Sequence, residues 1–129
     1  MIYEIALLSV HNEHIEMFRR AFATVAPLLG RAKGYGGHFL AQGIETPQLF
    51  NLIVRWQSLE DHTPGFEASE DHRMFMMGIQ EYLSEEPRVH HIEGATFATG
   101  EHDGLNSDFG MGNASAVGSL WPVDCHAAT

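Results

Sequence analysis

The chain has few cations, a single cysteine and no long apolar run, and each shortage excludes a class of protein. Its 129 residues include 7 Lys or Arg against 17 Asp or Glu, which gives a formal net charge of −10. Such a chain repels nucleic-acid phosphates and anionic membrane surfaces, so the sequence predicts neither as a partner. No apolar run approaches the roughly 20 residues that a membrane-spanning helix needs. The lone Cys125 cannot form an internal disulfide, which favours a reducing, cytoplasmic location.

The rest of the composition is typical of one globular domain. With 44% hydrophobic and 19% charged residues, the chain can bury a single core but not two. Its start, MIYEIALLSV, lacks the basic segment and small-residue cleavage site of a signal peptide, so we expect a first strand there.

Hydrophobic spacing predicts two helices. Asn12 is expected to cap the first helix, whose apolar residues recur every three or four positions, and Pro27 to kink or end it. Ser69 is expected to cap the second helix, which Pro87 stops. The apolar stripe of the second helix includes His72.

Four strands are expected around these helices. They span residues 2–10, 35–42, 50–56 and 89–97, with room for a bulge at the two consecutive glycines of the second strand. The resulting order β-α-β-β-α-β predicts an α+β, ferredoxin-like fold.

The third strand is apolar on both faces. Because side chains alternate along a strand, Asn51, Ile53 and Arg55 share one face, and Trp56 lies on the other. Two helices can cover only one face of such a sheet. The sequence therefore predicts a homodimer in which the uncovered sheet face meets a second copy of the chain.

The segment after this strand turns polar and predicts the rim of a pocket. Ser58 can cap a helical turn that carries His62, and the following Pro-Gly pair would break that turn. A covered strand with Trp56 near its end would supply the wall of the pocket.

Composition changes after Ala98, where Gly, Ser and Ala become frequent. We expect one domain over residues 1–98 and a tail over residues 99–129 that is dispensable for folding. If the tail is ordered, Phe109 or Trp121 is expected to dock it.

A set of motifs follows the third strand. They are Trp56, Leu59-Glu60-Asp61-His62, Gly65-Phe66, Ser69 and Pro87-Arg88-Val89-His90. These motifs, within about residues 2–97, resemble one branch of the antibiotic biosynthesis monooxygenase (ABM) family. The resemblance implies a dimeric α+β barrel with a pocket between the sheet and its helices. The family includes cofactor-free quinone-forming monooxygenases, haem-degrading enzymes, isomerases and proteins of no known activity, so function must be argued from the site.

The sequence departs from two of these groups. Polyketide-oxidising members carry an Asn and a Trp four residues apart on the third strand, whereas Asn51 and Trp56 are five apart. Without a bulge these two side chains face opposite ways. Haem-degrading members need an Asn on the first strand, and IYEIALLSV offers none, which counts against haem.

Two histidines are the candidate catalytic residues. Cofactor-free oxygenation needs a base that deprotonates a phenol or enol in a dry pocket, and His titrates in the right range. His62 matches the family motif, although a structural role in bonding nearby carbonyls fits as well. His72 lies on the apolar stripe of the second helix, where a partly buried core residue is the alternative. Candidate substrate contacts are Trp56, Asn51, Phe66 and Tyr35.

No metal or other cofactor is predicted. The sequence lacks Cys-x-x-Cys and His-Glu-x-x-His motifs, and the adjacent His90 and His91 point to opposite sides of a strand.

Two classes of function remain. The first is a cofactor-independent monooxygenase acting on a small phenolic or polyketide-like compound in secondary metabolism, or an isomerase or cyclase using the same pocket. The second is a non-catalytic ligand-binding or accessory dimer. A pocket histidine with a shifted pKa would favour catalysis.

Overall fold

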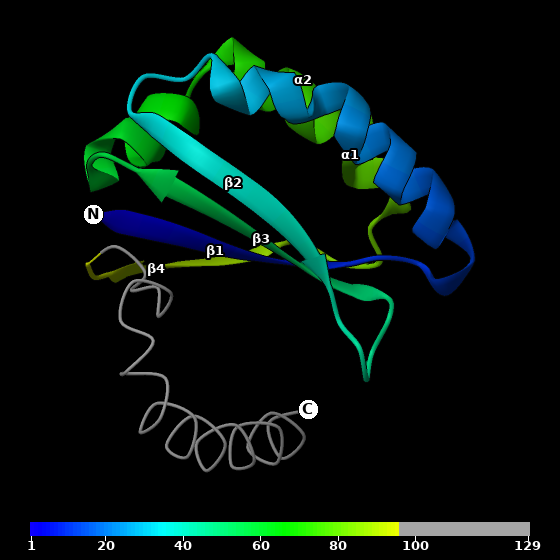
Figure 1. Ribbon diagram of the computed structural model, residues 1–129. Helices are drawn as coiled ribbons and strands as arrows, with labels where there is room; N and C mark the ends of the chain where they lie inside the picture. The colour runs from blue at the N-terminus through cyan, green and yellow to red at the C-terminus, as the bar shows by residue number, and fades with distance from the viewer. Residues whose placement is uncertain (96–129) are drawn as a thin grey trace, which may run out of the picture. The chain divides into compact units, whose positions relative to one another are not determined.

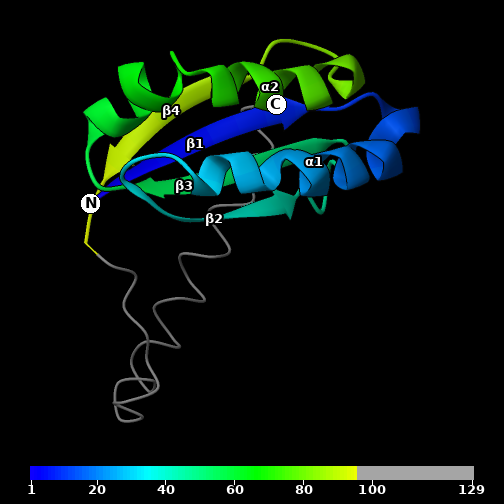
Figure 2. The ribbon, with the colours of Figure 1, turned by 90° about the horizontal axis from the view of Figure 1, so that it is seen from above.

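The computed structural model describes residues 1–95 as one four-stranded antiparallel sheet with two main helices. The strands, in the spatial order β2-β3-β1-β4, are β1 (Ile2–Ser9), β2 (Tyr35–Gln42), β3 (Leu49–Trp56) and β4 (Arg88–Glu93). The helices α1 (Ile15–Gly30) and α2 (Glu70–Ile79) lie side by side over one face of the sheet (Figures 1 and 2). The predicted element order and the α+β ferredoxin-like class are confirmed.

Alternation along the two central strands separates a covered face from an open one. The side chains under the helices are all buried: Glu4, Ala6 and Leu8 of β1, and Phe50, Leu52, Val54 and Trp56 of β3. The residues between them point to the other face, where no element within residues 1–95 covers the sheet. The predicted division of the third strand into two faces is confirmed.

The first helix begins later than predicted, and Pro27 does not end it. Asn12 opens a short 3₁₀ turn, η1 (Asn12–His14), without making a side-chain cap, and α1 starts at Ile15. α1 continues past Pro27 to Gly30. Proline removes one backbone hydrogen bond near the C-terminal end. Burial of Val25 and Leu29 on either side of it offsets that loss.

The segment after β3 agrees with the prediction. The Asp61 amide donates to Ser58 Oγ at 3.2 Å, as expected for a cap. The predicted break at the Pro-Gly pair is confirmed, because within the segment η2 (Asp61–Phe66) the backbone leaves helical geometry at Thr63 (φ −133, ψ 112), directly before a cis Thr63-Pro64 peptide. This segment turns the side chains of His62 and Phe66 inward, and both are buried.

The second helix and the last strand both end earlier than predicted. Ser69 caps α2 by accepting the His72 amide at 3.1 Å, as expected. A 3₁₀ turn, η3 (Gln80–Tyr82), follows α2 well before Pro87. β4 stops at Glu93 because its partner β1 begins at Ile2, directly opposite, so no strand remains to pair with residues further on.

Two glycine features fix the packing around the covered face. The register of β2 shifts between Tyr35 and His38, which confirms the predicted bulge, and Gly37 has φ +128. A Cβ on Gly78 would lie 2.5 Å from Val25 Cγ1, so this glycine lets α2 approach α1 closely.

The predicted tail, with Phe109 and Trp121, and the end of the predicted fourth strand at 96–97 lie outside the described residues. Among the helices of residues 1–95, none is long and apolar enough to cross a membrane.

Candidate active site

A cavity of about 270 Å³ lies between the sheet and the second helix. Its lining is mostly apolar and comes from β1, β3, α1, η2, α2 and the segment that leads into β4. The polar side chains among the lining residues are Glu4, His62, Glu67, His72 and Glu86. Of the six predicted site residues, three line this cavity: His62, Phe66 and His72.

One of the two buried polar side chains in the lining is Glu4, which is only 7% exposed. Its Oε1 accepts a hydrogen bond from Trp56 Nε1 at 3.0 Å and lies 3.2 Å from His62 Nε2. Burial raises the pKa of Glu4 to about 7, because the charged form loses its hydration. The Trp56 hydrogen bond opposes this rise, and the charge of Glu67 adds to it. Glu4 therefore exchanges a proton near neutral pH.

His62 is held on three sides and is 3% exposed. Its Nε2 faces Glu4, its Nδ1 lies 2.8 Å from His91 Nε2, and its ring stacks on Trp56 with centroids 5.2 Å apart. Burial, with a smaller contribution from His91, lowers the pKa of His62 to about 4, and the charge of Glu67 opposes this lowering. The short distance to Glu4 would allow an ion pair, but these pKa directions make it a hydrogen bond of a neutral imidazole at neutral pH.

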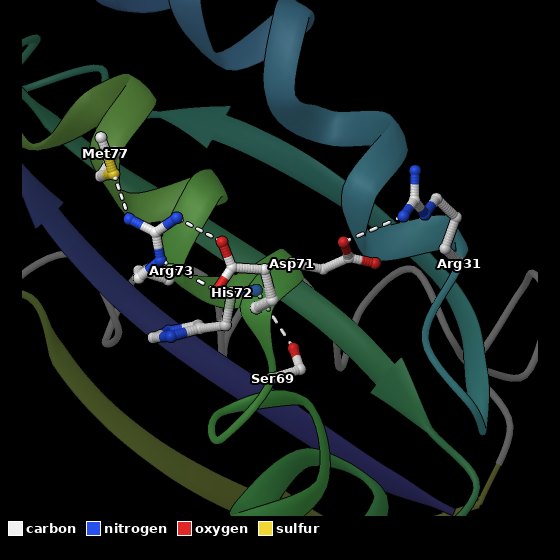
Figure 3. Close-up of polar contacts among 7 residues, drawn as sticks. Arg31, Ser69, Asp71, His72, Arg73 and Met77 are labelled. Atoms are coloured by element: carbon white, nitrogen blue, oxygen red, sulfur yellow. Dashed lines mark hydrogen bonds and ion pairs between the residues drawn. The ribbon is translucent and has the colours of Figure 1, made fainter.

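His72 has a freer setting in the first turn of α2. Its ring meets Phe66 edge-on at 5.3 Å, and no hydrogen bond to its ring nitrogens forms within residues 1–95. Its side chain points away from Asp71, which reaches Arg31, the residue directly after α1 (Figure 3). Burial lowers the pKa of His72, so its ring is neutral at pH 7 and can bond to a ligand in the cavity.

The other three predicted site residues lie outside the cavity lining. Trp56 is fully buried behind it and contacts Glu4, His62 and Phe66. Tyr35 packs edge-on against Trp56, and its hydroxyl bonds to His38. Asn51 is on the open face, because β3 pairs with β1 without a bulge and keeps Asn51 and Trp56 on opposite sides.

Sequence reasoning missed Glu4 and His91. Glu4 is the only charged residue in β1, and it has the same parity as the buried Ala6 and Leu8. Strand alternation could thus have placed it on the covered face. His91 could not have been paired with His62, since the two are 29 positions apart and meet only through the fold.

The charge of the cavity lining is negative. Glu4, Glu67 and Glu86 line it, and no Lys or Arg is among its lining residues. Glu67 and Glu86 are exposed, which places them at the rim rather than the base. Within the described part of the chain, no group of three or more His, Cys, Asp or Glu side chains is arranged to hold a metal ion.

Comparison with known proteins finds one family and several similar proteins. The family described as antibiotic biosynthesis monooxygenase (ABM) matches residues 1–77. YczJ of Bacillus subtilis, an uncharacterised protein, is 31% identical over 93 residues, which are 72% of this chain and 98% of YczJ. A Bordetella bronchiseptica protein named after the antibiotic biosynthesis monooxygenases is 33% identical, with a TM-score of 0.70 over 73% of this chain and 96% of that one.

A more distant relative shares the fold. It is a variant of SnoaB, a cofactor-independent oxygenase from Streptomyces nogalater, with a TM-score of 0.63 and 14% identity. The match covers 74% of this chain and 94% of SnoaB.

Proposed function

Because the chain belongs to the antibiotic biosynthesis monooxygenase family, we propose that it is a cofactor-independent monooxygenase of an uncharged phenolic or polyketide-like compound in secondary metabolism. The observation that carries this proposal is the buried Glu4 carboxylate, whose pKa of about 7 suits a general base. SnoaB, which shares the fold, is a cofactor-independent oxygenase and adds support.

Glu4 takes the role of base that the sequence suggested for His62. Both ring nitrogens of His62 are engaged, and its pKa of about 4 makes it a weak base at neutral pH. His62 and Trp56 instead position the Glu4 carboxylate from two directions. The second predicted residue, His72, lines the same cavity with an available ring and would donate a hydrogen bond to the substrate oxyanion.

The proposed reaction conserves atoms and charge. Glu4 accepts the phenolic proton, so one negative charge moves from the carboxylate to the substrate within the cavity. The phenolate gives electrons to O2, and a C–O bond forms to yield a peroxide, which receives the proton. Loss of the C–H proton at that carbon and cleavage of the O–O bond then give a quinone and water. The substrate supplies all the electrons.

The charge of the lining limits the substrate. Three carboxylates without a neighbouring cation in the lining raise the energy of any anionic ligand. A compound that enters uncharged and is deprotonated inside by Glu4 avoids this repulsion. A matched pair tests it: 1-naphthol is expected to bind at pH 8 in titration calorimetry, and 1-naphthoate to bind much more weakly. In the double variant Glu67→Gln/Glu86→Gln, the difference in affinity between the two ligands should become smaller. An unchanged ratio of the two dissociation constants would contradict the role of these carboxylates.

We also propose that two copies of the chain associate through their open sheet faces. Ile5, Phe39 and Ile53 lie in one row across three strands on that face. Phe39 is 57% exposed, although its neighbours in the row are apolar. A second copy would cover this row, as the alternation of the central strands predicts.

The test of the enzymatic proposal uses protein freed of metal, flavin and haem. With an uncharged hydroxynaphthalene or anthrone substrate, we expect O2 uptake matched by quinone formation. Glu4→Gln should lower kcat about a hundredfold or more with little change in KM, because a base acts in the transition state. The exposed carboxylate variant Glu13→Gln serves as the matched control. Full activity of Glu4→Gln would refute the assignment.

The same experiment separates the alternatives. An isomerase or cyclase would convert the substrate through Glu4 without consuming O2. An accessory protein would bind the ligand equally well in wild type and Glu4→Gln, seen as equal thermal shifts, and would turn over nothing.

A further inference from the structure

His91 contacts the site without lining the cavity. It lies on β4, an edge strand, directly opposite Glu4 of β1, and its side chain is partly exposed. His90, the next residue back, points to the open face of the sheet because side chains alternate. His91 therefore touches the buried cluster while part of its side chain reaches the molecular surface.

A continuous line of polar atoms runs from the buried carboxylate to this edge. Glu4 Oε1 lies 3.2 Å from His62 Nε2, and His62 Nδ1 lies 2.8 Å from His91 Nε2. His62 thus contributes one ring nitrogen to each of its two neighbours along the line. Trp56 Nε1 donates to the same Oε1 and holds the end of the line in place.

This arrangement can exist in two proton states. With Glu4 ionised, His62 carries its proton on Nε2 and donates to Oε1, while His91 Nε2–H donates to His62 Nδ1. With Glu4 protonated, Oε1–H donates to His62 Nε2, His62 Nδ1–H donates to His91 Nε2, and His91 carries its proton on Nδ1. Loss of that last proton to water converts the second state into the first by three short transfers. Neither imidazole becomes charged in the end states.

We propose that His62 and His91 form a proton relay that keeps the Glu4 carboxylate in exchange with solvent while a ligand fills the cavity. The relay rests on the proposed function in one respect, since it assigns a proton path to the base of that reaction. A ligand in the cavity blocks the direct approach of water to Glu4, and the imidazole line approaches Glu4 from the β4 side instead. His91 is a positioning residue in this scheme.

Other titratable groups lie near the relay and influence its pKa values, so their effects must be distinguished from proton transfer along the relay. Glu67 raises the pKa of Glu4 and opposes the lowering of the His62 pKa, and His72 lowers the pKa of His62. A change at Glu67 would shift the titration of Glu4, and a change at His72 that of His62, without exchanging the two histidine tautomers. Tautomer exchange is therefore the readout that separates a relay from a purely electrostatic effect.

The first experiment needs no substrate. In ¹⁵N NMR spectra recorded across about pH 6–8, we expect His62 and His91 to exchange tautomers together with the shift of the Trp56 Nε1–H signal, on one titration curve. A single His62 tautomer throughout that titration would overturn the relay. Because no turnover is measured, failure of the oxygenase proposal would leave this result intact.

The second experiment uses His91→Gln in the full-length protein. Glutamine can keep a hydrogen bond to His62 but cannot pass a proton, so a structural role would be preserved and the relay would be lost. We expect kcat to fall about tenfold or more with KM unchanged, and added imidazole to restore it. His90→Gln, on the opposite face of the strand, is the control. Unchanged kcat in His91→Gln at every buffer concentration would overturn the relay.

Discussion

The two faces of the sheet are built from the same strands, yet their polar groups differ in whether they find partners within one chain. On the covered face, Glu4 is bonded to Trp56 and His62. On the open face, Arg55 donates from Nη2 to the Gly36 carbonyl, but its buried Nε has no hydrogen bond within residues 1–95. Buried polar groups normally have partners. Glu4 is thus bonded from two sides within one chain, whereas one buried donor on the open face has no partner within residues 1–95.

Neighbouring residues on one strand therefore have different surroundings. Val54 and Ile53 are neighbours in sequence, but the first packs under the helices and the second belongs to the proposed contact between copies. Substitutions at such neighbours should therefore fail in different ways. A charge on the covered face should unfold the chain, and a charge on the open face should separate the copies.

The largest expected effect comes from placing the same charge on each face in turn. Val54→Asp buries an unpaired carboxylate at a position with no exposure and should cost about 4–5 kcal/mol or more of unfolding free energy. Ile53→Asp should instead give a folded monomer. Circular dichroism and light scattering at micromolar concentration check the pair. Unfolding of both variants, or a dimer of the Ile53→Asp variant, would contradict the proposed difference between the two faces.

The next effect concerns the centre of the covered face. Trp56→Ala should lower the unfolding free energy by about 3–5 kcal/mol, because a fully buried aromatic ring is lost. Trp56→Phe should cost less. It removes the Nε1–H donor that holds the pKa of Glu4 down, so this pKa should rise further. Urea denaturation and NMR titration measure the two quantities. An unmoved Glu4 titration in Trp56→Phe would contradict the hydrogen bond.

A smaller effect appears as the pH dependence of stability. Native Glu4 keeps its proton up to about pH 7 instead of 4.5, so its contribution makes the unfolding free energy fall as pH rises through that window. Native His62 stays neutral down to about pH 4 instead of 6.5, so its contribution makes the unfolding free energy rise with pH over that window. Each slope is at most about 1.4 kcal/mol per pH unit, and the two oppose each other between 4.5 and 6.5.

Single substitutions should reveal how much each group contributes to the pH dependence of the unfolding free energy. Relative to wild type, Glu4→Gln should become steadily more stable as pH rises from 4.5 to 6.5, and His62→Gln steadily less stable. Urea denaturation at three pH values in this range is the measurement, and the difference from wild type removes the contributions of groups common to all three proteins. Parallel profiles for the two variants would show that the pair does not titrate as described.

The smallest expected effect is at Asn51, which the sequence suggested as a substrate contact. Its side chain lies on the open face, separated from the cavity by the sheet itself. Asn51→Ala should change the affinity for a cavity ligand by less than about twofold, within the range usual for a residue remote from a site. Calorimetry with 1-naphthol checks this. His72→Gln, which alters a cavity-lining residue, is the comparison variant.

Much of the fold could be predicted because alternation and helical spacing are local properties of the sequence. The two faces of β3 and the Ser69 cap are examples. The ends of elements were less predictable, since they depend on partners. β4 ends at Glu93 because β1 supplies no further pairing residue, and α1 passes Pro27 because its packing on both sides holds it.

The site was predictable only in part for a similar reason. The motif placed His62 and Phe66 at a pocket, and both line it. The chemical state of His62 depends on its burial and on His91, which reaches it from β4. Burial then shifts the pKa of His62 and that of Glu4 in opposite directions, which no local pattern encodes.

The stacking of Trp56 on His62 has a spectroscopic consequence. An excited indole transfers an electron readily to a protonated imidazole and poorly to a neutral one. The emission of Trp56 should thus remain bright at neutral pH and be quenched as His62 gains its proton near pH 4. With Trp121→Phe removing the second tryptophan of the sequence, the molecule would carry its own fluorescent reporter beside the buried carboxylate.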